Sequence, residues 1–244
     1  MSRLKNAPRT IAVPHLKNAL TPTEQDILKA IAAGETCVRC VAKVDRKTRW
    51  TSDFLALVDH LRQKYETRIR IESGLEVAIL NADGDLDLPL LETEPDHLLV
   101  RLEGFPYGHY RYAPHHIRGF WEDERESQTT LYRHYFRALI GAMWKHQHVI
   151  LVDPLSLLSQ AGLAEEDAPI EYLAGLCRAM NETQSHMMVS GLLYEPGGDA
   201  VRFLQVFGLN RENKHRMPPP RFIPTYRYTP EQLYSANAVY DLAA

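Results

Sequence analysis

The stretch Pro169–Leu209 constrains the fold of this chain more than any other. Apolar residues at helical spacing predict a helix over Ile170–Ser185. Two apolar runs follow, Met187–Glu195 and Val201–Phe207, and Pro196-Gly197-Gly198-Asp199 between them is typical of a tight turn. A helix that leads directly into a hairpin is the back half of a winged helix, so this stretch favours an α+β fold.

The same order of elements is predicted earlier in the chain. A helix precedes Cys37–Val44, a run that alternates as a short strand does, and Asp53–Tyr65 has the pattern of an amphipathic helix. Ala82-Asp83-Gly84 lies between two apolar runs, Glu76–Asn81 and Asp85–Leu91, which is a strong hairpin signal. We therefore expect helix, strand, helix and hairpin to occur twice.

This repeat, together with composition, divides the chain into five segments. The tetrapeptide Asp53-Phe54-Leu55-Ala56 resembles Glu171-Tyr172-Leu173-Ala174, and each opens the helix that feeds a predicted hairpin. The fold class that we predict is α+β, with two winged-helix-like units and basic N- and C-terminal extensions. The segments are a basic arm (1–20), a first winged-helix-like unit (21–103), an aromatic linker (104–123), a second winged-helix-like unit (124–209) and a basic, proline-rich tail with a short final helix (210–244).

With Asp53–Leu80 as a helix and strand pair, the chain resembles tandem winged-helix proteins in element order over nearly its whole length. Two such families are the kite-type accessory subunits of bacterial SMC complexes, of the MukE kind, and plasmid replication initiators. The first resemblance implies a dimeric adaptor that binds an SMC–kleisin assembly, and the second implies binding to a replication origin. The helix Ile170–Ser185 departs from the initiator pattern because Arg178 is its only cation.

Charge is distributed unevenly along the 244 residues, whose formal net charge is −3. Through Arg70 there are 14 Lys and Arg against 7 Asp and Glu, a balance of +7, and the remainder has the other 14 against 24, a balance of −10. A basic leading segment on an acidic body indicates a polyanionic partner. The sequence therefore favours a non-enzymatic nucleic-acid-associated protein of prokaryotic type, whose first unit contacts phosphates and whose second unit docks partners.

Two sets of residues carry this hypothesis. The cations that we expect to contact phosphates are Arg3, Lys5, Arg9, Lys43, Arg46, Lys47, Arg49, Arg62, Lys64 and Arg68. The residues that we expect to dock a protein partner or a second copy of the chain are Leu173, Met187, Met188 and Phe203. A first alternative is an adaptor subunit of a larger complex, kite-like and without affinity for DNA.

A second alternative is a metal-dependent enzyme that uses Asp83, Asp85 and Asp87, which offer carboxylates at alternate positions. Alternate carboxylates beside a turn are more often a solvated face. Cys37 and Cys40 have the spacing of half a zinc site, but no second close pair follows. We therefore predict no catalytic residues, no metal and no cofactor.

The compartment is predicted from what the sequence lacks. The longest apolar runs are far too short for a membrane span, and Met1–Asn18 is polar and basic, unlike a secretory signal. Three cysteines form no disulfide pattern. These features favour the reducing cytoplasm and no association with a membrane.

Overall fold

A computed structural model describes residues 5–13, 19–164, 167–189 and 192–194 of the chain, and all structural statements concern these residues. The helices are α1 (Leu20–Ala32), α2 (Thr51–Tyr65), α3 (Pro114–Glu122), α4 (Gln128–His146), α5 (Ser156–Gln160) and α6 (Ile170–Thr183). The strands are β1 (Lys5–Asn6), β2 (Arg9–Ala12), β3 (Cys37–Lys43), β4 (Arg70–Ala78), β5 (His97–Arg101), β6 (Phe105–Tyr107), β7 (Tyr110–Tyr112), β8 (Ile150–Val152), β9 (His186–Val189) and β10 (Leu192–Tyr194).

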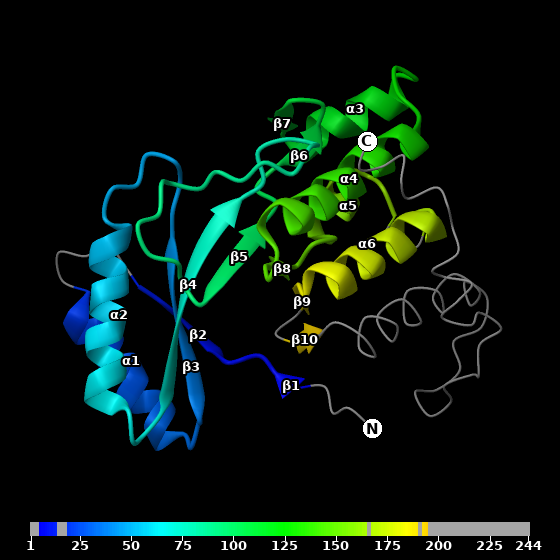
Figure 1. The fold of residues 1–244 in the computed structure, drawn as a ribbon. Coiled ribbons are helices and arrows are strands. Elements are labelled where there is room, and N and C mark those ends of the chain that lie inside the picture. Colours follow the sequence, from blue (N-terminus) through cyan, green and yellow to red (C-terminus); the bar gives the residue numbers. More distant parts are fainter. Residues whose placement is uncertain (1–4, 14–18, 165–166, 190–191, 195–244) are drawn as a thin grey trace, which may run out of the picture.

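One mixed, mostly parallel sheet organises the molecule (Figure 1). Its order is β1-β10-β9-β8-β5-β4-β3-β2, and the separate pair β6-β7 is antiparallel. The six strands from β2 to β9 are parallel and lie side by side in the order in which the chain forms them. Only the two edge pairings, β9 with β10 and β10 with β1, are antiparallel.

The helices cover one face of this sheet. Alternate residues of β3, namely Val38, Cys40 and Ala42, belong to one apolar cluster with residues of α1, α2, α4 and α6. Since successive side chains of a strand point to opposite faces, Arg39 and Val41 lie on the other face, which we call the inner face. Parallel strands in chain order with helices on a single face are the arrangement of βα barrels.

The N-terminal segment brings the two edges of the sheet together. Asn6 of β1 pairs with Leu192 at one edge, whereas Arg9 of β2 pairs with Val38 at the opposite edge. The three chain steps from Asn6 to Arg9 span at most about 10 Å, so the edges must approach one another. Counted with β1 and β2 as one interrupted strand, the structure is a seven-stranded sheet curled on itself.

The curl explains why the inner face is buried. Val41, Leu99, Ile150 and Val152 form a second apolar cluster there, on the face opposite the helices. The cluster is closely packed at Gly74, where an added Cβ would lie 2.7 Å from Leu99 Cδ1. These side chains fill the middle of the curled sheet, as layers of branched residues fill a barrel.

The structure does not confirm the two winged-helix units. The first predicted hairpin is largely absent, because β4 pairs in parallel with both β3 and β5. Across the turn at residues 82–84 there is a single antiparallel bridge, from Ile79 to Leu86. Periodicity showed which runs are strands, but it carries no information about whether neighbouring strands are parallel.

The second predicted hairpin is also displaced. Its expected first strand, Met187–Glu195, is divided between β9, which ends at Val189, and β10, which begins at Leu192. The expected turn Pro196–Asp199 and second strand Val201–Phe207 lie outside the described residues. Both predicted units contribute strands to the same sheet, and the predicted linker, residues 104–123, contains β6, β7 and α3. The order helix, strand, helix, strand does recur, as α1-β3-α2-β4 and as α4-β8-α6-β9 with the short α5 added.

None of the described helices combines the length and the apolar character needed to cross a lipid bilayer.

The turn after β4 is seated directly on the backbone of α4. Gly84 has φ +78°, and a Cβ added there would lie 2.2 Å from the backbone nitrogen of Ala142. A Cβ added to Gly141 of α4 would lie 2.4 Å from the carbonyl oxygen of Asp83. Two facing glycines therefore allow a closeness that any side chain would prevent.

We predict that Gly84→Ala lowers the free energy of unfolding by about 3 kcal/mol, since the new methyl group adds a clash to an unfavourable φ. Gly34→Ala is the matched control, because Gly34 has φ +76° and no atom within 4 Å of an added Cβ. This control should lose only about 1 kcal/mol. Urea unfolding of both variants measures the difference, and equal losses would show that the contact with α4 contributes nothing.

Candidate functional site

The inner face carries charged residues at both ends of its apolar layer. At the carboxyl ends of the strands lie Lys43, Glu76, Arg101, Glu103 and Arg111, which we call the strand-end cluster. At the amino ends lie Arg39, Arg70, Glu72 and His97, the strand-start cluster. The register places the apolar cluster around Val41 and Leu99 between these two groups.

The strand-end cluster joins β3, β4 and β5 with β7. Lys43 pairs with Glu103, Arg101 Nε lies 2.9 Å from Glu76 Oε2, and Arg111 Nη1 lies 3.6 Å from Glu103 Oε2. The hydrogen bond to Glu103 raises the pKa of Lys43, so this side chain stays charged. Three cations face two carboxylates, which leaves the cluster with one formal positive charge.

The loop after β3 extends the strand-end cluster with further cations. The Asp45 carboxylate accepts hydrogen bonds from the Thr48 hydroxyl at 2.9 Å and from the Lys47 amide at 2.9 Å, and these bonds lower the pKa of Asp45. Arg46 Nε donates to Asp87 at 2.9 Å. The loop is therefore held in one shape, and it presents the exposed side chains of Lys47 and Arg49. Asp45 interacts electrostatically with Lys47, but among the described residues neither cation has an acidic side chain within ion-pair distance.

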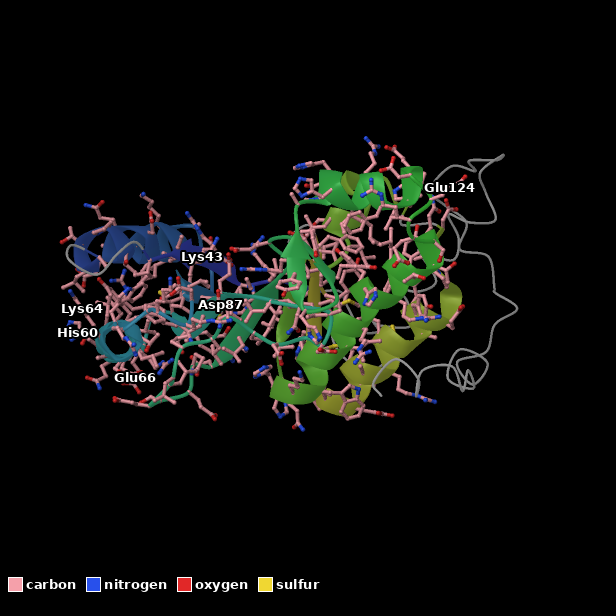
Figure 2. The ribbon with its side chains drawn as sticks, turned by 90° about the horizontal axis from the view of Figure 1, so that it is seen from above. Lys43, His60, Lys64, Glu66, Asp87 and Glu124 are labelled. Carbon is pink, nitrogen blue, oxygen red and sulfur yellow. The ribbon has the colours of Figure 1, made fainter. Side chains whose placement is uncertain are left out.

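The predicted phosphate-contacting cations fall into two groups at opposite ends of α2. Four of them, Lys43, Arg46, Lys47 and Arg49, precede the start of the helix at the strand-end side. The four at the other end are Arg9, Arg62, Lys64 and Arg68. Since α2 has 15 residues, about 22 Å separates the two groups. In Figure 2, Lys43 and Asp87 lie beside the strands, whereas His60, Lys64 and Glu66 surround α2.

Acidic partners occupy most of the cations at the amino ends of the strands. Arg62 lies 2.6 Å from Asp59 and 2.7 Å from Asp96, Arg9 lies 3.3 Å from Glu35, and Lys64 pairs with Glu24. The guanidinium of Arg68 lies 6.0 Å from the centre of the Tyr65 ring. Arg3 and the side chain of Lys5 lie outside the described residues.

The predicted docking residues lie mainly inside the molecule. Leu173 and Met187 are buried in the main apolar cluster, and Met188 packs partly buried against the inner one. Phe203 lies outside the described residues. In this structure α6 and β9 therefore use these residues to build the core, which leaves Leu173 and Met187 inaccessible to a partner.

The three alternate aspartates each contact a different cation. Asp83 lies 2.7 Å from Arg137 Nη2, Asp85 pairs with Lys145, and Asp87 pairs with Arg46. Arg137 and Lys145 flank Gly141 on one stripe of α4, so the first two carboxylates hold the turn against that helix. Within the described residues, no three His, Cys, Asp or Glu side chains gather as a metal site requires.

The two cysteines of β3 point in different directions. Cys40 is fully buried among the helix-facing residues, and burial raises the pKa of its thiol to about 12. Cys37, three positions earlier on the same strand, is on the inner face. Side chains on opposite faces of a strand cannot bind one zinc ion together.

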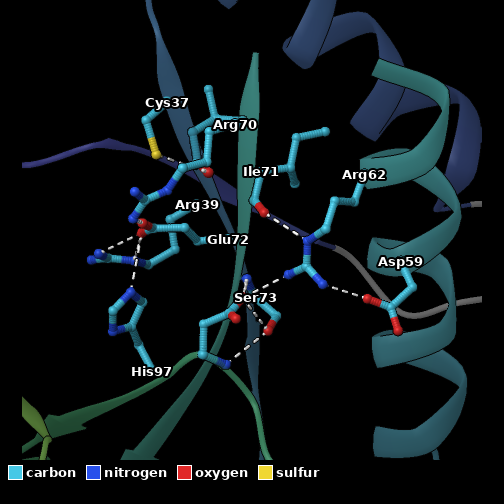
Figure 3. A network of polar contacts seen from close by, with 11 residues as sticks. Cys37, Arg39, Asp59, Arg62, Arg70, Ile71, Glu72, Ser73 and His97 are labelled. Carbon is cyan, nitrogen blue, oxygen red and sulfur yellow. Dashed lines mark hydrogen bonds and ion pairs between the residues drawn. The ribbon is translucent and has the colours of Figure 1, made fainter. Parts of the chain in front are cut away.

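The strand-start cluster is centred on a buried carboxylate (Figure 3). Glu72 Oε2 accepts hydrogen bonds from Arg39 Nη2 at 2.8 Å and Arg39 Nε at 3.2 Å, and His97 Nε2 lies 3.1 Å away. Glu72 Oε1 pairs with Arg70. Burial by itself raises the pKa of Glu72, but the contacts with His97, Arg70 and Arg39 outweigh it and hold the pKa far below its ordinary value.

A cavity of about 730 Å³ opens beside this cluster. The neighbouring Asp96 carboxylate accepts hydrogen bonds from the Ser73 amide at 2.6 Å, the Ser73 hydroxyl at 2.9 Å and Arg62 Nη2 at 2.7 Å, which ties the start of β5 to β4. The cavity is lined by Thr36, Arg62, Glu66, Thr67, Arg68, Ile69, Arg70, Ile71, Glu72, Asp96 and His97.

Sequence reasoning did not identify this second cluster. A signal was present at Arg39, which is a charge between apolar residues of a strand-like run, whereas Glu72 belongs to a run in which charged and apolar residues alternate. Such a charge inside a strand requires a partner. The partners could not be named, since the parallel register that sets Arg39 opposite Glu72 was unknown.

No family model matches this chain, and no curated protein matches it.

Glu72→Gln should destabilise the protein in a pH-dependent way. The substitution leaves the buried Arg39 without its counter-charge, so we expect a loss of about 3 kcal/mol at pH 7. The pKa of Glu72 in the folded protein lies below its ordinary value of 4.5. The stabilisation from the ionised carboxylate is therefore fully present above pH 4.5 and is lost progressively as the pH falls below that value. The difference in free energy of unfolding between wild type and variant should therefore decrease by about 2 kcal/mol from pH 7 to pH 3.

Urea unfolding at several pH values measures this gap. Glu66→Gln is the control, since Glu66 is exposed on the rim of the same cavity and its substitution should change stability by at most about 0.5 kcal/mol. If the stability difference between wild type and Glu72→Gln stays constant from pH 7 to pH 3, the ionised Glu72 is not the counter-charge that stabilises Arg39.

Proposed function

We propose that this protein binds nucleic acid, without catalysis, through a strand-end face formed by residues 43–49, Arg101 and Arg111. The observation that carries the proposal is the pair Lys47 and Arg49, which are exposed on an ordered loop and lie beyond ion-pair distance of the acidic side chains in the described part of the chain. Phosphates of a nucleic acid supply the missing negative charge.

The position of this face supports the proposal. Ligands of folds with parallel strands and crossover helices bind at the carboxyl ends of the strands, because loops from several strands converge there. Lys43, Glu76 and Arg101 occupy these ends on three neighbouring strands. Cations outnumber carboxylates in the strand-end cluster, so an approaching phosphate meets a net positive surface.

The order of the loop also favours binding. The hydrogen bonds of Asp45 and the contact between Arg46 and Asp87 fix the backbone before any ligand arrives. A phosphate contact made from this loop therefore orders only the ends of two long side chains. The other end of α2 offers less to a phosphate, because Arg62 and Lys64 both pair with acids there, whereas the strand-end face adds Lys47 and Arg49 to its paired cations.

The double variant Lys47→Ala/Arg49→Ala tests the proposal. Anisotropy of labelled duplex and single-stranded DNA should show binding by the wild type that weakens steeply as salt rises. The variant should bind at least tenfold more weakly at about 50 mM salt, and the slope of log K against log salt should become shallower by about 2.

Lys64→Ala/Arg68→Ala is the matched control, because it removes the same charge from the far end of α2. It should bind like the wild type. Wild-type protein without salt-sensitive binding to either DNA, or equal losses in the two double variants, would overturn the proposal.

A further inference from the structure

We propose that the strand-end face binds single-stranded nucleic acid in preference to duplex, with unpaired bases stacked on Tyr110 and Trp50 and phosphates at the neighbouring cations. This inference rests on the proposed function and names the class of nucleic acid that the face takes. Proteins that hold single strands without reading their sequence combine cations along the backbone with exposed aromatic rings on which the bases stack. The strand-end face offers both kinds of group.

The first argument is an exposed ring beside the strand-end cluster. Tyr110 is 67% exposed at the start of β7, which Figure 1 shows past the arrowhead of β4. The next residue, Arg111, belongs to the cluster, because its Nη1 lies 3.6 Å from Glu103 Oε2. Successive side chains of a strand point to opposite faces, so the hairpin presents a ring on one face and a guanidinium on the other. A single strand that crosses this edge can stack a base on Tyr110 and place a phosphate near Arg111.

The second argument is that the hairpin holds this ring in place. At the tip of the hairpin, the Ala82 amide donates a hydrogen bond of 2.9 Å to the Gly108 carbonyl. The Tyr110 ring lies edge-on to that of Tyr112, with 6.5 Å between the ring centres, and Tyr112 packs in the same way on Phe120 of α3 at 5.6 Å. A base that stacks on Tyr110 therefore meets a platform that is ordered before binding.

The loop after β3 supplies a second ring. Trp50 follows Arg49 directly and immediately precedes α2, so it lies at the strand-end side of the sheet. Its side chain packs against the main apolar cluster and remains partly exposed. Cations and aromatic rings are therefore neighbours at two points of the face, in this loop and in the β6-β7 hairpin.

The placement of the cations disfavours a duplex. A duplex keeps its bases inside the stack, and its major groove is entered by a helix or by a projecting two-stranded ribbon. The cations of the strand-end face lie on strands and in one loop, and none of them lies on a described helix. The β6-β7 ribbon does not project, because it is packed on α4, where the rings of Phe105 and Tyr135 are 5.1 Å apart.

Tyr110→Ala tests the inference without removing a charge or a buried side chain. Anisotropy compares oligo-dT, a duplex and an abasic strand that keeps the phosphates, each of about 20 nucleotides and at equal salt. The wild type should bind oligo-dT at least tenfold more tightly than either other probe, since only oligo-dT offers unpaired bases. Tyr110→Ala should weaken binding to oligo-dT about tenfold and leave binding to the abasic strand unchanged.

Two conservative variants complete the test. Tyr110→Phe keeps the ring and should bind oligo-dT like the wild type. Oligo-dT should quench the tryptophan fluorescence of the wild type, and Trp50→Phe should lose most of this quenching because a stacked base lies on that indole.

The inference is overturned if the wild type binds the duplex or the abasic strand as tightly as oligo-dT, or if Tyr110→Ala binds oligo-dT like the wild type. It is also overturned if Tyr110→Phe loses as much affinity as Tyr110→Ala, or if the quenching persists in Trp50→Phe. These results leave the proposed function standing as long as binding is salt-sensitive and Lys47→Ala/Arg49→Ala weakens it. Absence of binding to all three probes would instead overturn the proposed function, and this inference with it.

Discussion

The structure depends on the pairing of one short segment with both edges of its sheet. Residues 5–12 add β1 beside β10 and β2 beside β3, with only Ala7 and Pro8 between the two strands. Pro8 has no amide hydrogen, so it interrupts the strand at the point where the chain passes from one edge to the other. This double pairing curls the sheet, removes its open edges and turns the face without helices into an interior.

An interior of this kind restricts which charges it can hold. Arg39 and Glu72 are almost wholly buried, and both are charged, because each desolvated group faces an opposite charge at hydrogen-bond distance. The charges of the strand-end cluster are partly exposed and remain hydrated. Their ion pairs are therefore weaker, and the cations remain accessible. The two ends of one curled sheet thus differ: one holds a buried ion pair, and the other presents partly exposed cations.

Sequence reasoning located the helices other than α3 and the central strands β3, β4, β5 and β8, and it failed on how they pair. It also assigned β1 and β2 to a basic arm, and β6, β7 and α3 to a linker. The amphipathic pattern of Asp53–Tyr65 correctly placed α2, and the alternation in Cys37–Val44 placed β3. Burial periodicity is the same for a strand with parallel neighbours and for one in a hairpin, so the predicted hairpin depends on the Asp-Gly turn after β4 alone. The turn exists, but its contact is with α4, through Gly84 and Gly141, which are far apart in sequence. The basic loop after β3 was recognisable from composition, whereas the cluster around Glu72 needed the register of three strands.

The closing segment also has a temporal consequence. Lys5 leaves the ribosome long before Leu193, its partner in the sheet. The parallel strands between them can form successively as each βα unit is completed, because each contacts the strand that precedes it in the sheet. The closure that buries the interior charges has the longest sequence separation in the described sheet, so these charges stay hydrated until residues 192–194 have been synthesised. The pairing of β1 with β10, which closes the sheet, is therefore among the last pairings of the described strands that synthesis allows.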